Sequence, residues 1–235
     1  MSFTDAPAVA VVVAAGSGSR LGAAVPKALV ELDGVPLVRR AVDALLAGGV
    51  AQIVVTVPAD YEPAFRAALF SSLVETTRLV PGGDTRQDSV RLGLAALDAP
   101  DDAVVLVHDA ARCLVPAEVV RAVTEAIRDG ADAAIPVVPV VDSIRRVDGE
   151  ENSIVDRARL RAVQTPQAAR LGVLRAAHDQ VAADGVEVTD DASVCEYAGY
   201  AVTLVSGHRD AMKITEPIDL ILASAILREQ KHRQP

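Results

Sequence analysis

Aromatic residues are scarce in this chain. Phenylalanine, tyrosine and tryptophan together make up 3% of the 235 residues, and tryptophan is absent. The hydrophobic fraction is nevertheless 51%, which is enough for a substantial core built mainly from alanine, valine and leucine. The length allows one large domain or two small ones, and we expect a single domain spanning residues 1–235.

Cysteine is also rare. Cys113 and Cys195 stand far apart and form no C-x-x-C pair, which fits neither a zinc site nor a disulfide framework. Two buried thiols in a reducing compartment are the expected arrangement. An apolar run near the N-terminus is preceded by Asp5 and by no lysine or arginine, unlike a secretion signal, and it is too short to cross a membrane. We therefore expect a soluble, cytoplasmic protein with no membrane partner.

Positive charge is in deficit. The chain carries 23 lysines and arginines against 32 aspartates and glutamates, a formal net charge of −9. Binding to a nucleic acid relies on extended neutralisation of backbone phosphates by lysine and arginine, so we expect no nucleic-acid partner. An anionic ligand must instead meet a local cluster of cations.

Such a cluster is indicated in the stretch from Ala8 to Lys27, A-V-A-V-V-V-A-A-G-S-G-S-R-L-G-A-A-V-P-K. Its apolar run is typical of a doubly buried parallel strand, which places the following loop at the carboxyl edge of the sheet, where ligands bind. Gly16 and Gly18 allow backbone N–H groups to approach an anion, and Arg20 and Lys27 add positive charge. The spacing matches neither a dinucleotide fingerprint nor a P-loop. Phosphate binding is the prediction, and a glycine turn with solvated cations is the alternative.

Beyond this loop, helical and strand patterns alternate, which indicates β-α-β units and a Rossmann-like α/β fold with a mainly parallel sheet flanked by helices. We expect strands at about 52–57, 77–80, 103–107, 132–141 and 200–205. We expect helices at about 37–46, 61–73, 85–97, 116–129, 167–183, 190–198 and from 215 onward. Asp84 and Thr189 are the predicted caps of two of these helices, and the tail after Leu227 is expected to fray.

Between about 141 and 163 the pattern changes to a hairpin. Two extended pieces, 143–147 and 154–157, flank the polar turn 148–152 and carry charge on both sides. Such a hairpin has little to bury within one subunit, so we expect a projecting β-arm that pairs with a second chain. A solvated surface hairpin in a monomer is the alternative.

An ordered set of motifs then covers almost the whole chain: A-A-G-S-G-S-R-L-G…P-K, G-G-D-T-R-Q-D-S-V, V-H-D-A-A-R, V-D-S, V-D-R-x-x-L-x-x-V-Q-T-P-Q, T-D-D-A-S and M-K-I-T-E-P-x-D-L. Together they resemble the 2-C-methyl-D-erythritol 4-phosphate cytidylyltransferase family. The resemblance implies a nucleotidyltransferase (glycosyltransferase-A-like) fold and a homodimer formed through the β-arm. It also implies transfer of CMP from CTP to methylerythritol phosphate, with release of pyrophosphate, in the non-mevalonate isoprenoid pathway.

The same resemblance implies the site residues. Arg20 and Lys27 would hold the triphosphate, Lys213 would lie near the α-phosphate, and Asp109 and Asp210 would serve Mg²⁺. The nucleotide would be bound by Ala14, Ala15, Gly16, Gly18, Gly83, Asp84 and Ser89. The acceptor would be bound by Asp109, Ala110, Arg112, Thr165 and, from the partner's arm, Ser143 and Arg157.

These residue types suit the chemistry. A phosphate monoester has a second pKa of about 6, so the acceptor is already an anionic nucleophile at neutral pH and needs no general base. Catalysis then consists of positioning and of cations, Mg²⁺ among them, that offset the charge of the phosphates. The resemblance implies no acid or base role for His108. For Asp210, an acidic surface residue without a metal is the alternative.

Three positions depart from the family pattern: Ala28 replaces a glutamine beside Lys27, Cys113 replaces a proline, and Ser143 replaces a threonine. None of them removes a charged catalytic group. Ribitol 5-phosphate is an alternative acceptor, and a non-catalytic nucleotide-binding regulator is an alternative of another class. Intact Arg20, Lys27, Arg157 and Lys213 argue against the regulator, since a pure binder has no need of transition-state cations.

Overall fold

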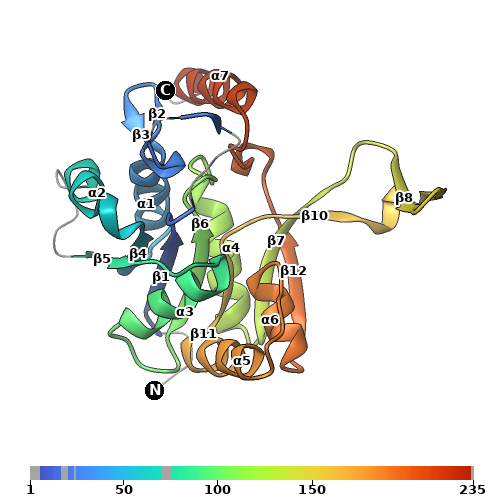
Figure 1. Ribbon diagram of the computed structural model, residues 1–235, viewed down its shortest axis with the longest axis horizontal. Coiled ribbons are helices and arrows are strands. Elements are labelled where there is room, and N and C mark those ends of the chain that lie inside the picture. Colours follow the sequence, from blue (N-terminus) through green and yellow to red (C-terminus); the bar gives the residue numbers. More distant parts are fainter. Residues whose placement is uncertain (1–5, 17–20, 24, 70–75, 234–235) are drawn as a thin grey trace.

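The structure is a computed structural model that describes residues 6–16, 21–23, 25–69 and 76–233. Its centre is an eight-stranded sheet with helices on both faces (Figure 1). The strands follow the order β10 (Arg161–Val163), β7 (Ala133–Pro139), β11 (Gln167–Arg170), β6 (Val104–Asp109), β1 (Ala8–Val13), β4 (Gln52–Val57) and β5 (Thr77–Pro81), while β12 (Val202–Ser206) pairs with β7. Among the strands formed by the described residues, only β10 and β11 run antiparallel to their neighbours in this sheet, so the expected mainly parallel α/β sheet is confirmed.

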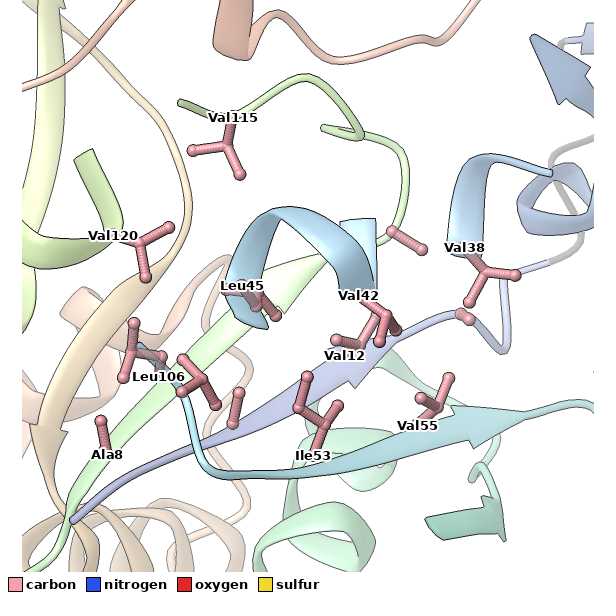
Figure 2. Close-up of a cluster of buried hydrophobic side chains, with 14 of the residues drawn as sticks. Ala8, Val12, Val38, Val42, Leu45, Ile53, Val55, Leu106, Val115 and Val120 are labelled. Atoms are coloured by element: carbon pink, nitrogen blue, oxygen red, sulfur yellow. The ribbon is translucent and has the colours of Figure 1, made fainter. Parts of the chain in front are cut away.

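Strand β1 lies at the centre because it pairs in parallel with β4 on one side and β6 on the other. Alternate residues point to opposite faces of a strand, and both faces of β1 are buried. Val12 packs with α1 (Leu37–Ala47), α2 (Glu62–Leu69) and α4 (Ala117–Arg128), as Figure 2 shows in part. Val11 packs with α3 (Arg86–Ala96), α5 (Leu171–Ala183) and α6 (Asp191–Tyr197).

A smaller apolar cluster joins the chain after the β1 loop to the last helix, α7 (Pro217–Arg233). Leu220, Ala223 and Leu227 of α7 pack there with Leu32 of the short hairpin β2 (Glu31–Leu32) and β3 (Val35–Pro36). The expected fraying after Leu227 is wrong, because the helix continues to Arg233.

The hairpin prediction is confirmed as a structural element. Strands β8 (Ile144–Asp148) and β9 (Glu151–Val155) form a separate antiparallel pair that projects from the body of the protein (Figure 1). Val147 and Ile154 leave 72% and 65% of their surface exposed. Whether this arm pairs with a second chain stays a prediction.

Tertiary pairing overrides the helical spacing at 167–170. The sequence pattern predicted one helix over 167–183, but Gln167–Arg170 is strand β11, and the helix begins only at Leu171. Ala168 and Ala169 are paired with β6 on one side and β7 on the other. Backbone groups buried between two strands need ladder partners, and small alanines fit that position.

Both predicted helix caps are displaced by one residue. Thr85, not Asp84, caps α3, since its Oγ1 accepts from the Asp88 N–H at 3.0 Å while the Asp88 carboxylate accepts from the Thr85 N–H. Asp190, not Thr189, caps α6 by accepting from the Ser193 N–H. The expected helix at 61–73 is described only as Glu62–Leu69, because 70–75 lie outside the described residues. Within the described ranges, no helix is both long and apolar enough to cross a membrane.

Candidate active site

A cavity of about 210 Å³ opens at the carboxyl ends of β1 and β6, as the sequence predicted for the loop after the first strand. Its walls come from the end of β1, the turn before α3, the end of β6, and two lysines from distant segments. The lining residues are Val13, Ala14, Ala15, Gly16, Lys27, Ala28, Gly83, Asp84, Thr85, Arg86, Ser89, Asp109, Ala110, Ala111 and Lys213. The structure therefore brings together most of the residues that the resemblance assigned to the nucleotide.

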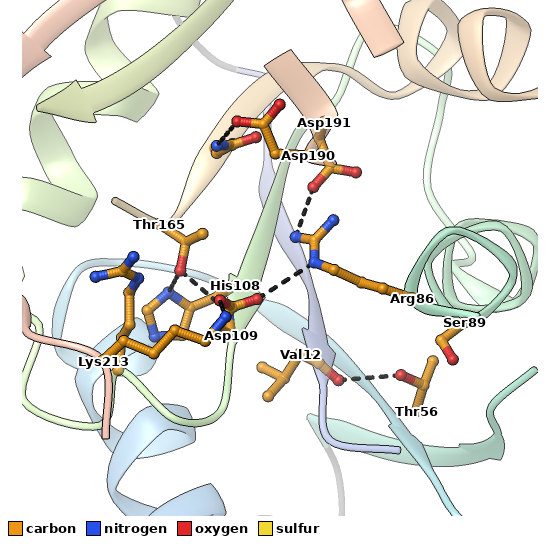
Figure 3. Close-up of polar contacts among 12 residues, drawn as sticks. Val12, Thr56, Arg86, Ser89, His108, Asp109, Thr165, Asp190, Asp191 and Lys213 are labelled. Carbon is orange, nitrogen blue, oxygen red and sulfur yellow. Dashed lines mark hydrogen bonds and ion pairs between the residues drawn. The ribbon is translucent and has the colours of Figure 1, made fainter. Parts of the chain in front are cut away.

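Asp109, the last residue of β6, is the acidic centre of this cavity. One carboxylate oxygen lies 2.8 Å from Lys213 Nζ, and the other lies 3.4 Å from Arg86 Nε (Figure 3). Burial alone would raise the pKa of Asp109, but Arg86, Lys213 and Arg112 lower it well below its usual range. Asp109 is therefore ionised at neutral pH, between two cations.

Arg86 is a charged residue of the site that sequence reasoning missed. It lies in the first turn of α3 and reaches between two carboxylates, with Nη2 at 2.8 Å from Asp191 (Figure 3). Asp191 is 2% exposed and also lies 3.0 Å from His178 Nε2. The available signal was the motifs themselves, since Arg86 stands in G-G-D-T-R-Q-D-S-V and Asp191 in T-D-D-A-S.

The turn before α3 is shaped by glycines and by Ser89. A Cβ atom at Gly82 would lie 2.4 Å from the Ala15 side chain, and one at Gly83 would lie 2.4 Å from Asp88. The Ser89 hydroxyl accepts from the Gly83 N–H at 3.1 Å and donates to the Thr85 carbonyl at 3.0 Å. Ser89 thus fixes the turn that forms one wall of the cavity.

Beneath the cavity, Thr165 holds the end of β6. Its hydroxyl oxygen accepts from the Asp109 N–H at 3.0 Å and contacts His108 Nδ1 at 3.1 Å. His108 is fully buried, and burial lowers its pKa to about 4. The imidazole is therefore neutral at pH 7 and has no access to a substrate proton.

The segment that carries Lys213 is tied to the sheet from several sides. Lys27 Nζ donates to the Ile214 carbonyl at 3.1 Å, and the Ile214 N–H donates to the Ala111 carbonyl at 2.9 Å. Arg112 donates to the carbonyls of Ala211 at 2.9 Å and Val163 at 3.2 Å. Arg112 thus braces this segment from outside the cavity lining.

Several other predicted site residues do not line the cavity of their own chain. Ser143 and Arg157 are exposed at the base of the arm, where Arg157 donates to the Val141 carbonyl. Asp210 accepts from Gln230 Nε2 at 2.8 Å and does not line the cavity. Arg20 and Gly18 lie outside the described residues.

Metal ligands are sparse. Within the part of the chain that the structure describes, no group of three His, Cys, Asp or Glu side chains is placed to hold a metal ion. Asp109 is the carboxylate that lines the cavity alongside Asp84. Mg²⁺ commonly binds through one or two carboxylates, several waters and substrate phosphates, so this donor set suits Mg²⁺ only with the nucleotide present.

An α/β sheet with a glycine turn and cations gathered at its carboxyl edge is suited to binding the phosphates of a nucleotide, and the similar proteins below are nucleotidyltransferases. The 2-C-methyl-D-erythritol 4-phosphate cytidylyltransferase family model matches residues 8–229, and the chain belongs to this family. The enzyme of that name from Saccharopolyspora erythraea is 51% identical over 93% of this chain and 98% of its own length. The one from Streptomyces coelicolor is 47% identical over 97% and 87%. The crystal structure of the Thermus thermophilus enzyme, 36% identical, matches with a TM-score of 0.78 over 93% of this chain and 98% of that one.

Proposed function

We propose that this chain transfers CMP from CTP to 2-C-methyl-D-erythritol 4-phosphate and releases pyrophosphate, a step of isoprenoid biosynthesis. Membership of the family supports this activity. The observation in the structure that carries it is the cavity at the end of β1, with Lys27 and Lys213 on its wall and ionised Asp109 between Lys213 and Arg86.

The reaction needs positioning more than proton transfer. The acceptor phosphate is a dianion above its second pKa of about 6, so it attacks the α-phosphorus of CTP without a base. Buried, neutral His108 agrees with a site that uses no general base. Lys27 and Lys213 offset the charge that repels the two reactants and the charge that builds on the leaving pyrophosphate.

Nucleotide choice is assigned to the turn before α3. Gly82 lies against Ala15 and Gly83 lies against Asp88, with no room for a side chain at either glycine. The Gly83 backbone lines the cavity and is assigned to hydrogen-bond a pyrimidine, and a larger purine would have to displace the turn. Asp84 and Ser89 belong to the same wall.

Mg²⁺ is assigned to Asp109 together with the phosphates of CTP. The bound ion supplies charge neutralisation at the phosphates. Asp109 suits this role because its carboxylate stays ionised at neutral pH. The part of Asp210 in metal binding rests on the family resemblance alone, since its carboxylate is engaged with Gln230. Excess EDTA is expected to abolish turnover, and undiminished activity in EDTA would remove Asp109 from this role.

The arm is assigned to dimerisation. Its strands expose Val147 and Ile154 and pair with each other rather than with the central sheet. Ser143 and Arg157 are exposed at its base, apart from the cavity of their own chain. If the arm crosses to a second chain, Ser143 and Arg157 would complete the acceptor site of that chain. The two buried free thiols support a reducing, cytoplasmic compartment.

The deciding experiment measures pyrophosphate release by the purified protein. CTP with methylerythritol phosphate is expected to give the fastest turnover. Parallel reactions replace the acceptor with ribitol 5-phosphate and CTP with ATP. Faster turnover with ribitol 5-phosphate would transfer the assignment to that acceptor, and faster turnover with ATP would refute the role of the turn.

A further inference from the structure

Two buried glutamines flank Thr165-Pro166, and the mechanism above uses neither of them. Gln164 and Gln167 are 5% and 3% exposed. Thr165 between them bonds the Asp109 N–H. The side chains of both glutamines bond to segments that are distant in the sequence, and each of those segments carries a charged residue of the site.

Gln164 holds the segment that leads to Lys213. Its Nε2 donates to the His208 carbonyl at 2.8 Å and to the Ala211 carbonyl at 3.4 Å, and its Oε1 accepts from the His208 N–H at 3.1 Å. The contact is close, because a Cβ atom at Gly207 would lie 2.4 Å from Gln164 Oε1. A single side chain therefore fixes the backbone just before Lys213 at both a donor and an acceptor.

Gln167 holds the start of α6 in the same manner. Its Nε2 donates to the Asp190 carboxylate at 2.9 Å, and its Oε1 accepts from the Ala192 N–H at 2.9 Å. Asp191 lies between these two bonded residues, so its position along the backbone is fixed on both sides. The Asp191 carboxylate in turn holds Arg86, the second cation on Asp109.

We infer that Gln164 and Gln167 are positioning residues for the transfer reaction. Gln164 acts through Lys213, and Gln167 acts through Asp191 and Arg86, so one short segment aligns both cations that flank Asp109. This inference rests on the proposed function. An amide suits each position because it offers a donor and an acceptor at once, which neither a carboxylate nor an apolar side chain does.

Double-mutant cycles test the inference through kcat/KM. Gln164→Met keeps the length of the side chain and removes the amide, and it is expected to lower kcat/KM about tenfold or more, because small misplacements of catalytic groups are costly. In a Lys213→Ala background the same change is expected to cost less than about twofold, since residues that act through one another are not additive. Gln167→Met is tested in the same way against Arg86→Met.

Thr124→Val is the matched control for lost stability. Thr124 is 4% exposed, and its hydroxyl donates to the Val120 carbonyl within α4, away from the cavity. This variant is expected to lower stability and leave kcat/KM unchanged. Hydrogen exchange supplies a readout without catalysis: Gln164→Met should speed exchange of the His208 amide, Gln167→Met that of the Ala192 amide, and Thr124→Val neither.

The outcomes distinguish failure of the proposed function from failure of the positioning role. Wild-type protein without CMP transfer would refute the proposed function. The wild-type protein could instead be active while the losses in kcat/KM from the glutamine variants multiply with those from Lys213→Ala or Arg86→Met. This independence would refute the positioning role. If a methionine variant does not fold, Gln164→Glu and Gln167→Glu replace it, since each keeps the acceptor and removes the donor. Wild-type kcat/KM in these glutamate variants would equally overturn the inference.

Discussion

Replacing Arg86 with methionine tests the charge network of the cavity directly. Methionine keeps much of the length of arginine and removes the guanidinium that joins Asp109 to Asp191. Removing one partner of a buried ion pair costs about 3–5 kcal/mol. The Arg86 side chain is 29% exposed, and each carboxylate keeps a second partner, Lys213 or His178. We therefore expect a loss of about 2 kcal/mol, a decrease in Tm of about 4–8 °C for a chain of this size.

The loss of stability in Arg86→Met is expected to depend on pH. Burial would raise the pKa of Asp109 and of Asp191, and Arg86 contributes to holding both below their usual range. A carboxyl group with a depressed folded-state pKa stabilises the protein above its unfolded pKa of about 3.9, and this stability is lost as pH falls through the folded-state pKa. The difference in the free energy of unfolding between wild type and Arg86→Met is therefore largest at pH 7, and it decreases as pH falls below about 4.

Urea unfolding of both proteins between pH 7 and pH 3 measures this difference in stability. Arg91→Met is the matched control, because Arg91 lies on the same helix and its ion pairs with Asp88 and Asp179, at 4.0 and 3.7 Å, are more exposed. It is expected to cost less than about 1 kcal/mol at any pH. Arg86→Met combined with Asp191→Asn should recover part of the lost stability. A pH-independent loss, or no recovery in the double variant, would refute the electrostatic explanation.

Further predictions concern catalysis, thiol chemistry and assembly. Lys27→Ala is expected to lower kcat by about 10²–10³ with the fold intact by circular dichroism, and a loss near twofold would make Lys27 a structural cation only. Burial raises the pKa of Cys113 and of Cys195 to about 12, so iodoacetamide at pH 7.5 should label both thiols only after unfolding. Labelling of the folded protein would contradict this. Mixing Lys27→Ala chains with Arg157→Ala chains should restore about a quarter of wild-type activity if the arm crosses between subunits, because one heterodimer site then carries neither change. Continued inactivity, with subunit exchange confirmed by mass spectrometry, would place both residues in a site of one chain.

Much of the fold and of the cavity followed from local pattern. The apolar run of β1 and its glycines predicted a central strand with a ligand loop at its carboxyl edge, because a doubly buried strand needs apolar residues on both faces. The ordered motifs indicated the family, and with it the residues that line the cavity. The hairpin at β8 and β9 was evident because two extended pieces flank a polar turn, and the charge on both sides of that turn leaves little to bury within one subunit.

Tertiary structure alone decided the rest. Residues Gln167–Arg170 have helical spacing, yet they form a strand because β6 and β7 offer backbone partners on both sides. Arg86 was given no role from the sequence, because only the fold places Asp109 and Asp191 within its reach, 23 and 105 residues away along the chain. Gln164 gave no sign of its role, because its partners at 208–211 come from a segment that only the folded sheet brings beside it. Local spacing determines which face of a helix or strand is buried. Ion pairs and the hydrogen bonds of buried side-chain amides depend instead on which distant segments the strand order makes neighbours.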